Sequence, residues 1–316
     1  MLYGKYDFHC EFGTEAVLPR YKGSTFRGVF GLALKRVVCA LKRQDCKDCI
    51  LKKRCVYARI FESVDPVLLP DGRVIHSPLR PFVIEPPPTE TRRFPPGAHF
   101  DFSLLLFGET NHNLPYFIYA FDRMGKTGIG SPVSGKRGRF SLKTVSSRNH
   151  VIFSHESQQL DMENAFVDMD IGEARQTHDV SRVKITLETP LRFKRDNRLS
   201  ADLPFPVFTR IMLRRANMLF HCHAQGPPPM DYPGLLDRAG DVVISRSSLR
   251  WFDWLRYSGR QAKEMRMGGV IGNIVYEGNL TEYMPLMDFC KKVHLGKQTA
   301  FGLGKFGVEV LGRPLP

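Results

Sequence analysis

The sequence predicts an α+β fold of two tandem ferredoxin-like domains, each an antiparallel sheet with helices on one face. An order of elements (strand, helix, strand, strand, helix, strand) occurs twice along the chain. A glycine- and lysine-containing turn also follows the last helix of each half and precedes its final strand. Because 316 residues accommodate two domains of roughly 150 residues each, we expect an N-terminal domain over 1–178 and a C-terminal domain over 179–316.

The first half begins with alternating apolar and polar residues over 7–12, a pattern typical of a half-buried strand. A helix is predicted to start near Ser24, because its apolar residues recur at helical spacing. Pro115 opens a second helix, since proline is favoured in a first helical turn. The other strands of this half are expected over 79–84, 100–107 and 139–145.

The second half repeats this order. Residues 183–188 alternate as a strand and precede a helix whose apolar face includes Phe208, Met212 and Leu219. Pro285 opens the last helix, as Pro115 does in the first half. The other strands are expected over 242–249, 270–276 and 306–311. The halves share a pattern of elements rather than sequence identity, so the predicted repeat is structural.

The turn of the second half, residues 294–307, is named the glycine-rich loop. It holds four glycines, two lysines and a histidine. Glycine lets backbone N–H groups approach a phosphate without a Cβ in the way, and lysine adds positive charge. The alternative is a tight helix-to-strand turn. The first-half counterpart is 125–130, with Gly-Lys followed by Gly-Ile-Gly.

A net charge of +14 favours a polyanionic partner. Six basic residues lie between Arg246 and Arg266, against two acidic ones, and both tryptophans of the chain, Trp251 and Trp254, are among them. Cations that bind phosphates beside flat rings that stack on bases are typical of single-stranded nucleic-acid binding. The alternative is an amphipathic hairpin with its tryptophans in the core and its arginines in water.

Four of the seven cysteines are closely spaced, as Cys39-x6-Cys46-x2-Cys49-x5-Cys55. The chain shows neither a signal peptide nor an apolar run long enough to span a membrane, so we expect a cytoplasmic protein without disulfides. Four thiolates at this spacing can bind a tetrahedral metal ion. Structural zinc is the first prediction, and an iron–sulfur cluster or free thiols are the alternatives.

Several segments resemble a known family: 22–31, 46–49 with 55–57 and 61–62, 256–261, 268–272 with 276–278, and 294–307. They are similar to the CRISPR-associated endoribonuclease that processes precursor CRISPR RNA. This is the sixth Cas family of the RAMP superfamily, in its larger variant with a four-cysteine insertion. The resemblance implies recognition of CRISPR repeat RNA by the second domain. It also implies metal-independent cleavage, without a catalytic cofactor, in which the RNA's own 2′-hydroxyl attacks and leaves a 2′,3′-cyclic phosphate.

The predicted RNA contacts combine the glycine-rich loop with the basic segment: Arg250, Trp251, Arg256, Arg260, Gly296, Lys297, Gly302, Gly304 and Lys305. The expected partner is the repeat RNA, together with a CRISPR effector complex or a second copy of the chain, and no membrane.

The family often places a catalytic histidine in or just before the first helix, but residues 18–41 contain none. His294, beside the glycine-rich loop, is therefore the first candidate for proton transfer, since histidine titrates near neutral pH. Its alternative is a histidine that stabilises the helix C-terminus. Tyr257 is the reserve proton carrier, Lys297 the predicted charge stabiliser, and Tyr21 with Lys22 the alternative at the family's usual position.

Two other functions remain open. A RAMP subunit could hold CRISPR RNA in an effector complex without cutting it, which would fit the missing histidine. A zinc-bearing nucleic-acid-binding regulator would explain the cysteines and the charge but not the duplicated fold.

Overall fold

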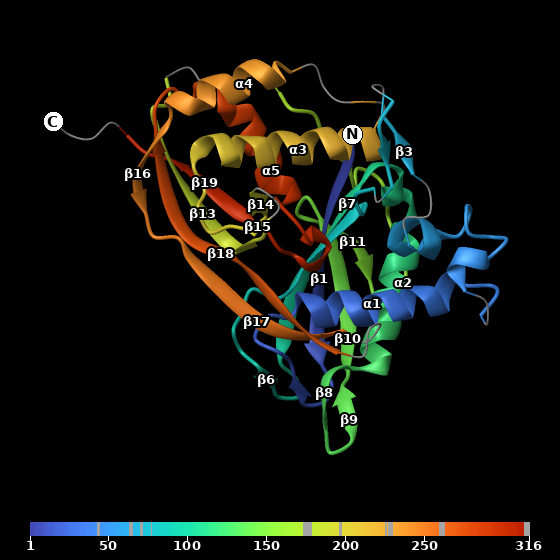
Figure 1. The fold of residues 1–316 in the computed structure, drawn as a ribbon. Coiled ribbons are helices and arrows are strands. Elements are labelled where there is room, and N and C mark those ends of the chain that lie inside the picture. The colour runs from blue at the N-terminus through green and yellow to red at the C-terminus, as the bar shows by residue number, and fades with distance from the viewer. Residues whose placement is uncertain are drawn as a thin grey trace. The chain divides into compact units, whose positions relative to one another are not determined.

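The computed structural model describes residues 1–42, 45–62, 66–69, 72–76, 78–172, 179–195, 198–224, 226, 230–258 and 263–312, with the side chains of 255–258 and 263–266 excepted. The chain divides into two compact units (Figure 1). Unit 1 holds Met1–Met169 with His221–Ala224, and unit 2 holds Asp170–Phe220 with 225–316. The predicted boundary after residue 178 adjoins 173–178, which lie outside the described residues.

The main sheet of unit 1 confirms the predicted ferredoxin-like order. Strand β1 (Leu2–Phe12) lies between β7 (His99–Phe107) and β10 (Phe140–Ser147), and β5 (Phe82–Glu85) pairs with β7. All of these neighbours are antiparallel. The sheet is extended by β11 (His150–Ser154) beside β10 and by β12 (Val167–Asp168) beside β1.

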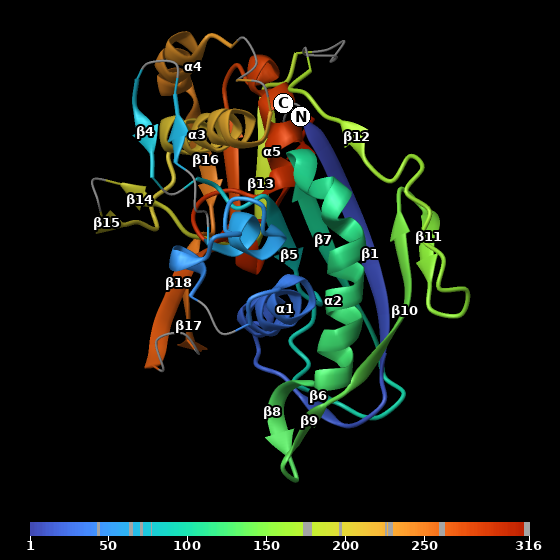
Figure 2. The same cartoon turned by 90° about the vertical axis from the view of Figure 1, so that its right-hand side faces the viewer.

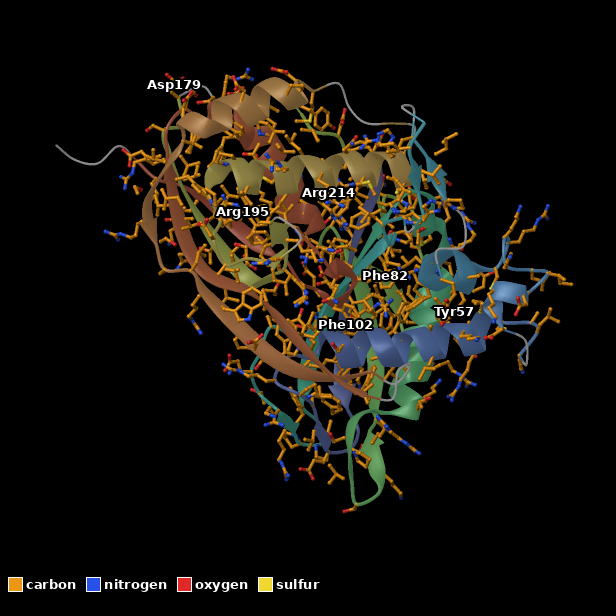
Figure 3. All side chains as sticks on the ribbon, in the orientation of Figure 1. Tyr57, Phe82, Phe102, Asp179, Arg195 and Arg214 are labelled. Atoms are coloured by element: carbon orange, nitrogen blue, oxygen red, sulfur yellow. The ribbon has the colours of Figure 1, made fainter. Side chains whose placement is uncertain are left out.

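Two helices, α1 (Gly23–Val38) and α2 (Leu114–Thr127), lie side by side on one face of this sheet (Figure 2). Their apolar residues recur at helical spacing, so each helix has one stripe that must be buried. Phe30 of α1 stacks on Phe121 of α2 with ring centroids 4.2 Å apart, and Phe102 of β7 lies 4.8 Å from Phe121. Figure 3 labels Phe102 and Phe82, which are both buried in unit 1. Stacked phenylalanines therefore hold the helices to the sheet.

Short strands complete unit 1. A second sheet has the order β6-β2-β8-β9, and a separate pair joins β3 to β4. Their bounds are β2 Ala16–Val17, β3 Val67–Leu68, β4 Val74–Ile75, β6 Arg93–Phe94, β8 Ile129–Val133 and β9 Lys136–Gly138. Short helical turns η1 (Cys46–Asp48), η2 (Ala58–Glu62) and η3 (Gly108–Asn113) connect the elements.

Unit 2 repeats the same topology, which confirms the tandem arrangement. Its sheet has the order β16-β18-β13-β19, with β13 (Arg182–Leu191) between β18 (Lys263–Glu277) and β19 (Phe306–Val310). Strand β16 (Val243–Ser247) pairs with one end of β18, and β17 (Arg250–Ser258) pairs with the other. Helices α3 (Phe205–His223) and α5 (Met284–Val293) are the two that the pattern predicts. A separate hairpin joins β14 (Lys194–Arg195) to β15 (Arg198–Leu199).

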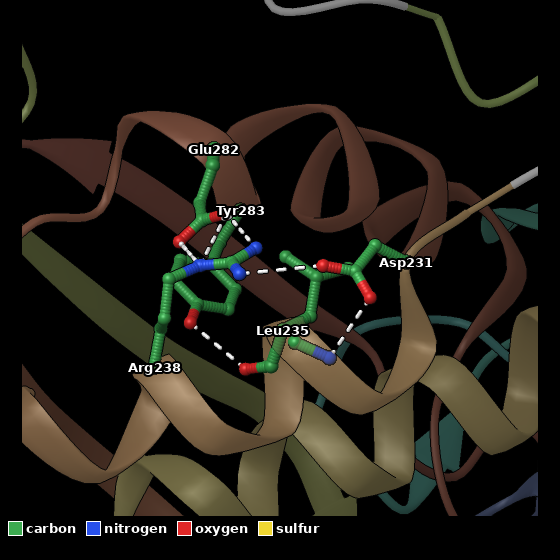
Figure 4. Close-up of polar contacts among 6 residues, drawn as sticks. Asp231, Leu235, Arg238, Glu282 and Tyr283 are labelled. Carbon is green, nitrogen blue, oxygen red and sulfur yellow. Dashed lines mark hydrogen bonds and ion pairs between the residues drawn. The ribbon is translucent and has the colours of Figure 1, made fainter.

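A short helix, α4 (Tyr232–Arg238), was not predicted, because proline-rich residues precede it. Figure 4 shows how it is fixed. The Arg238 guanidinium binds Glu282 at 2.7–3.1 Å and Asp231 at 3.3 Å, and the buried Tyr283 hydroxyl donates to the Leu235 carbonyl at 2.9 Å. These contacts hold α4 against the start of α5, which follows η5 (Thr281–Tyr283). Turns η4 (Ala239–Asp241) and η6 (Thr299–Phe301) are the other short helices of this unit.

Within the described part of the chain, no helix is both long and apolar enough to cross a membrane.

Candidate nucleic-acid interface

The glycines of the glycine-rich loop are required by the protein's own backbone. Gly296, Gly302 and Gly304 all have positive φ, between 78° and 83°. A Cβ at Gly296 would lie 2.5 Å from the Arg192 carbonyl oxygen, and one at Gly304 would collide with the Leu295 carbonyl. Residues with a side chain avoid both conditions, so these positions need glycine for a close backbone approach.

Backbone hydrogen bonds fix this loop to the end of β13. The Lys297 N–H donates to the Arg192 carbonyl at 2.7 Å, and the Gly304 N–H donates to the Pro190 carbonyl at 3.1 Å. The Thr189 hydroxyl donates to the Gly302 carbonyl and accepts from the Lys305 N–H, both at 2.8 Å. These three N–H groups are therefore bonded to the protein itself, which leaves the lysine side chains of the loop as its groups for binding phosphate. Lys297 is exposed, whereas Lys305 is half-buried, 3.7 Å from Glu188.

His294 is completely buried at the end of α5, with φ of 59°. Its Nδ1 lies 3.0 Å from the Leu303 carbonyl oxygen, and because a carbonyl can only accept, Nδ1 carries the proton in this contact. The side chain therefore joins the start of the glycine-rich loop to its middle. This geometry gives His294 a structural task, and its catalytic role stays a prediction.

Arg215 of α3 supports the same helix end. It is 4% exposed, and its Nε and Nη2 donate to the Val293 carbonyl at 3.2 and 2.7 Å. A buried guanidinium on the last carbonyl of α5 satisfies a backbone acceptor that lacks a helical partner and complements the helix dipole. The periodicity of α3 places Arg215 on its apolar face, but the sequence does not reveal the carbonyl that it binds.

Arg192 connects the glycine-rich loop with β17. While its carbonyl accepts from Lys297, its Nη1 donates to the Gly268 carbonyl of β18 at 2.7 Å. Gly268 lies directly against the indole of Trp251, since a Cβ there would be 2.5 Å from the ring. The Trp251 Nε1 donates to Asp253 at 2.7 Å. The two segments predicted to bind RNA are therefore connected through Arg192 and Gly268 within unit 2.

The aromatic side chains of β17 are partly accessible. Trp251, Phe252 and Trp254 are all half-buried, so the tryptophans are not core residues, and the Phe252 and Trp254 rings lie 5.7 Å apart. Arg250 beside them is exposed. The predicted contacts Arg256 and Tyr257 belong to β17, but their side chains lie outside the described residues, as does the whole of Arg260.

Tyr21 and Lys22, the alternative catalytic pair, precede α1 in unit 1. Lys22 is 1% exposed, and its Nζ donates to the carbonyls of Thr89 and Arg20. Burial lowers the pKa of the Lys22 ammonium and raises that of the Tyr21 hydroxyl. Lys22 thus fixes the segment before α1 to the loop that contains Thr89, and a catalytic role for the pair stays a prediction.

The four predicted metal ligands lie in the connection that follows α1. Cys39 ends this helix, Cys46 begins η1, and all four thiols, Cys49 and Cys55 included, are free and half-buried. Burial raises the pKa of Cys46, and the nearby Lys35 ammonium opposes that change. Among the described residues, no three cysteine, histidine or acidic side chains converge closely enough to hold a metal ion. Metal binding therefore stays a prediction.

Comparison with known proteins matches the two parts of the chain to two family models. A model of the CRISPR-associated endoribonuclease Cas6 matches residues 185–306, which include Arg192, β17 and the glycine-rich loop up to residue 306. This part of the chain is therefore a Cas6-type domain. Residues 1–165 match a second family model, AF_1859_N, described as an N-terminal domain. The resemblance to the CRISPR-RNA-processing endoribonuclease is thereby confirmed, and the four-cysteine insertion stays a prediction. Endoribonuclease activity on CRISPR RNA is the activity of that family.

Solved Cas6 structures share the fold of the whole chain. Cas6 (TTHB231) of Thermus thermophilus has a TM-score of 0.56 at 12% identity and covers 98% of both chains. Its product complex has a TM-score of 0.57 at 13% identity and covers 97% of this chain and 100% of that one. An uncharacterized protein of Archaeoglobus fulgidus is 24% identical over 215 residues, which is 68% of each chain.

Sequence reasoning missed several basic residues that the structure brings to this surface. Arg192 links the loop to β18, and three cations follow it on the β14–β15 hairpin, namely Lys194, Arg195 and Arg198. Four cations within seven residues are a signal that the sequence does contain. It went unused because the segment is short and contains no glycine that would suggest a phosphate-binding turn.

Proposed function

We propose that this protein is an endoribonuclease that cuts CRISPR repeat RNA into guide RNA, with the substrate's 2′-hydroxyl as the nucleophile. The observation that carries the proposal is the surface of unit 2 within the region matched by the Cas6 family. There Arg192 joins an exposed lysine, Lys297, to the half-buried aromatic rings of β17. Cations and stacking surfaces together are what a single-stranded segment of RNA requires.

The chemistry needs a cation and a proton carrier. Attack by the 2′-oxygen concentrates negative charge on the phosphorane, and a positioned ammonium stabilises that charge. Lys297 fits this role, because its backbone is fixed through Arg192 and, among the described residues, no carboxylate pairs with its exposed side chain. His294 is buried, so Tyr257 becomes the first candidate for proton transfer among the residues predicted in this unit. Tyr257 lies opposite Glu264 in the β17–β18 register. These roles use only the RNA and side chains, so the proposed reaction requires no metal ion.

Two observations favour a second candidate function. His294 is buried, and residues 18–41 lack a histidine. A RAMP subunit that binds CRISPR RNA without cutting it would have no need of an exposed imidazole.

A cleavage assay in EDTA distinguishes the two functions. The full chain is incubated with an end-labelled RNA that carries the repeat of its own CRISPR array. One discrete cut supports the endoribonuclease, whereas a stable complex with intact RNA supports the binding subunit. If the chain neither binds nor cuts the repeat, both proposals are wrong. Lys297→Ala is the matched variant, and we expect slower cleavage with folding unchanged, because its side chain is exposed.

We further propose that the four-cysteine segment binds zinc. The donor set fits this ion, because four thiols occur within seventeen residues and tetrahedral thiolate sites are typical of structural zinc. We expect about one zinc per chain in protein purified under reducing conditions, and loss of that metal with destabilisation of unit 1 in Cys49→Ser. Cys222→Ser, outside this segment, is the control. Elemental analysis that finds iron in place of zinc would identify a cluster, and protein without metal would leave the segment as free thiols.

A further inference from the structure

The hairpin of β14 and β15 projects positive charge from unit 2. In its register Lys194 pairs with Leu199 and Arg195 pairs with Arg198. All four side chains are exposed. Figure 3 labels Arg195 on this hairpin. The turn residues 196–197 lie outside the described part of the chain.

The base of the hairpin is firmly held. Directly before it, Phe193 is 3% exposed and Arg192 donates to the Gly268 carbonyl at 2.7 Å. After it, the buried Leu203 accepts through its carbonyl from the Tyr276 hydroxyl at 2.7 Å. Because the Arg192 carbonyl also accepts from Lys297, the hairpin begins beside the glycine-rich loop. The start of the hairpin is therefore held beside the glycine-rich loop, which belongs to the region proposed to bind RNA.

The cross-strand pair Arg195 and Arg198 is unfavourable for folding. Directly opposed side chains of an antiparallel pair lie on the same face, where two like charges repel. Among the described residues, Arg195 is compensated by Asp202 at 2.7 Å, and no carboxylate lies within ion-pairing distance of Arg198. A residue pair that destabilises the fold locally is typical of a functional site. A polyanion on this face would relieve the repulsion.

The composition of the hairpin indicates which part of the RNA it contacts. Its described residues are three cations and one leucine, and cationic side chains are suited to phosphate contacts. Phosphate contacts position a nucleic acid but carry no sequence information. We propose, on the basis of the function proposed above, that β14–β15 is a phosphate clamp that binds the RNA backbone whatever its sequence. Stacking on bases is then the task of β17.

Arg198 provides the test, because its loss should weaken RNA binding without weakening the fold. Binding of the full chain to its repeat RNA and to a scrambled RNA of equal length is measured over a series of salt concentrations. For Arg198→Gln we expect severalfold weaker binding to both RNAs alike, with a salt slope lower by about one unit. Its thermal stability should equal or exceed that of the parent, since the like-charge pair is removed. Arg198→Lys keeps the charge and should keep the parental slope, and Arg148→Asn in the exposed β10–β11 turn controls for net charge.

Two results would overturn the clamp specifically. One is parental binding of Arg198→Gln at every salt concentration. The other is loss of binding to the repeat RNA alone, which would mean that Arg198 reads sequence. If the parent itself binds neither RNA, the proposed function fails and the clamp fails with it, so the parental measurement separates the two conclusions. Unfolding of Arg198→Gln would also contradict the inference, because it would show that the arginine stabilises the hairpin.

Discussion

Replacing Gly304 with alanine is expected to be among the most damaging single changes in unit 2. A side chain at this position must adopt a φ of 78° and displace the Leu295 carbonyl, whose own N–H donates to the Gly304 carbonyl at 2.9 Å. The backbone conformation costs about 1–3 kcal/mol, and overpacking costs about 1–3 kcal/mol more. The free energy of unfolding, measured by denaturant titration, should therefore fall by about 2–6 kcal/mol. RNA binding should fall with it.

Gly240→Ala is the matched control in the same unit. A Cβ at Gly240 meets nothing within 4 Å, and its φ is outside the left-handed range. This variant should keep parental stability and RNA binding. If Gly304→Ala were as stable as Gly240→Ala, the close packing of the glycine-rich loop would not exist in solution.

A pair of substitutions at His294 separates holding the loop from transferring a proton. His294→Ala removes the donor to the Leu303 carbonyl and leaves a buried acceptor, so the free energy of unfolding should fall by about 1–3 kcal/mol. His294→Asn places an amide donor near the position of Nδ1 and tolerates the φ of 59°. It cannot exchange a proton near neutral pH. We therefore expect the asparagine variant to keep both parental stability and parental single-turnover cleavage.

The opposite result would identify a catalytic histidine. If His294→Asn folds and binds RNA as the parent does but cleaves about a hundredfold more slowly or worse, the imidazole carries the proton. His294 would then have to become accessible in the RNA complex. Circular dichroism and RNA affinity, measured on the same preparations, ensure that a loss of cleavage reflects chemistry.

The order of elements was predictable because it depends on local patterns. Apolar spacing identified the helices that became α1, α2, α3 and α5, and alternation identified the central strands of both sheets. The prediction was less accurate where a neighbouring segment decides the structure. Strand β18 extends to Lys263, well before the apolar run at 270–276, because it pairs with β17 along its whole first half. Helix α4 depends on Glu282, which lies 44 residues from Arg238.

The candidate site was partly predictable for the same reason. Glycines and lysines mark the glycine-rich loop in the sequence, but its N–H groups are bonded to 189–192, about a hundred residues earlier, and no local pattern reveals such a contact. The buried position of His294 likewise depends on contacts with other segments: its Nδ1 is bonded to the Leu303 carbonyl, and Arg215 of α3 binds the end of α5. A polar residue at a helix end is more often exposed, so its sequence context favoured an accessible histidine.

The decisive measurement is cleavage of a repeat RNA that carries a single 2′-deoxynucleotide immediately 5′ of the scissile phosphate. If the substrate's own hydroxyl is the nucleophile, the protein will bind this RNA as tightly as the all-ribose repeat and will not cut it. The all-ribose repeat will yield a 2′,3′-cyclic phosphate and a 5′-hydroxyl, in EDTA as in its absence. Cleavage of the deoxy-substituted RNA at the same position, or products with a 3′-hydroxyl and a 5′-phosphate, would contradict the proposed mechanism.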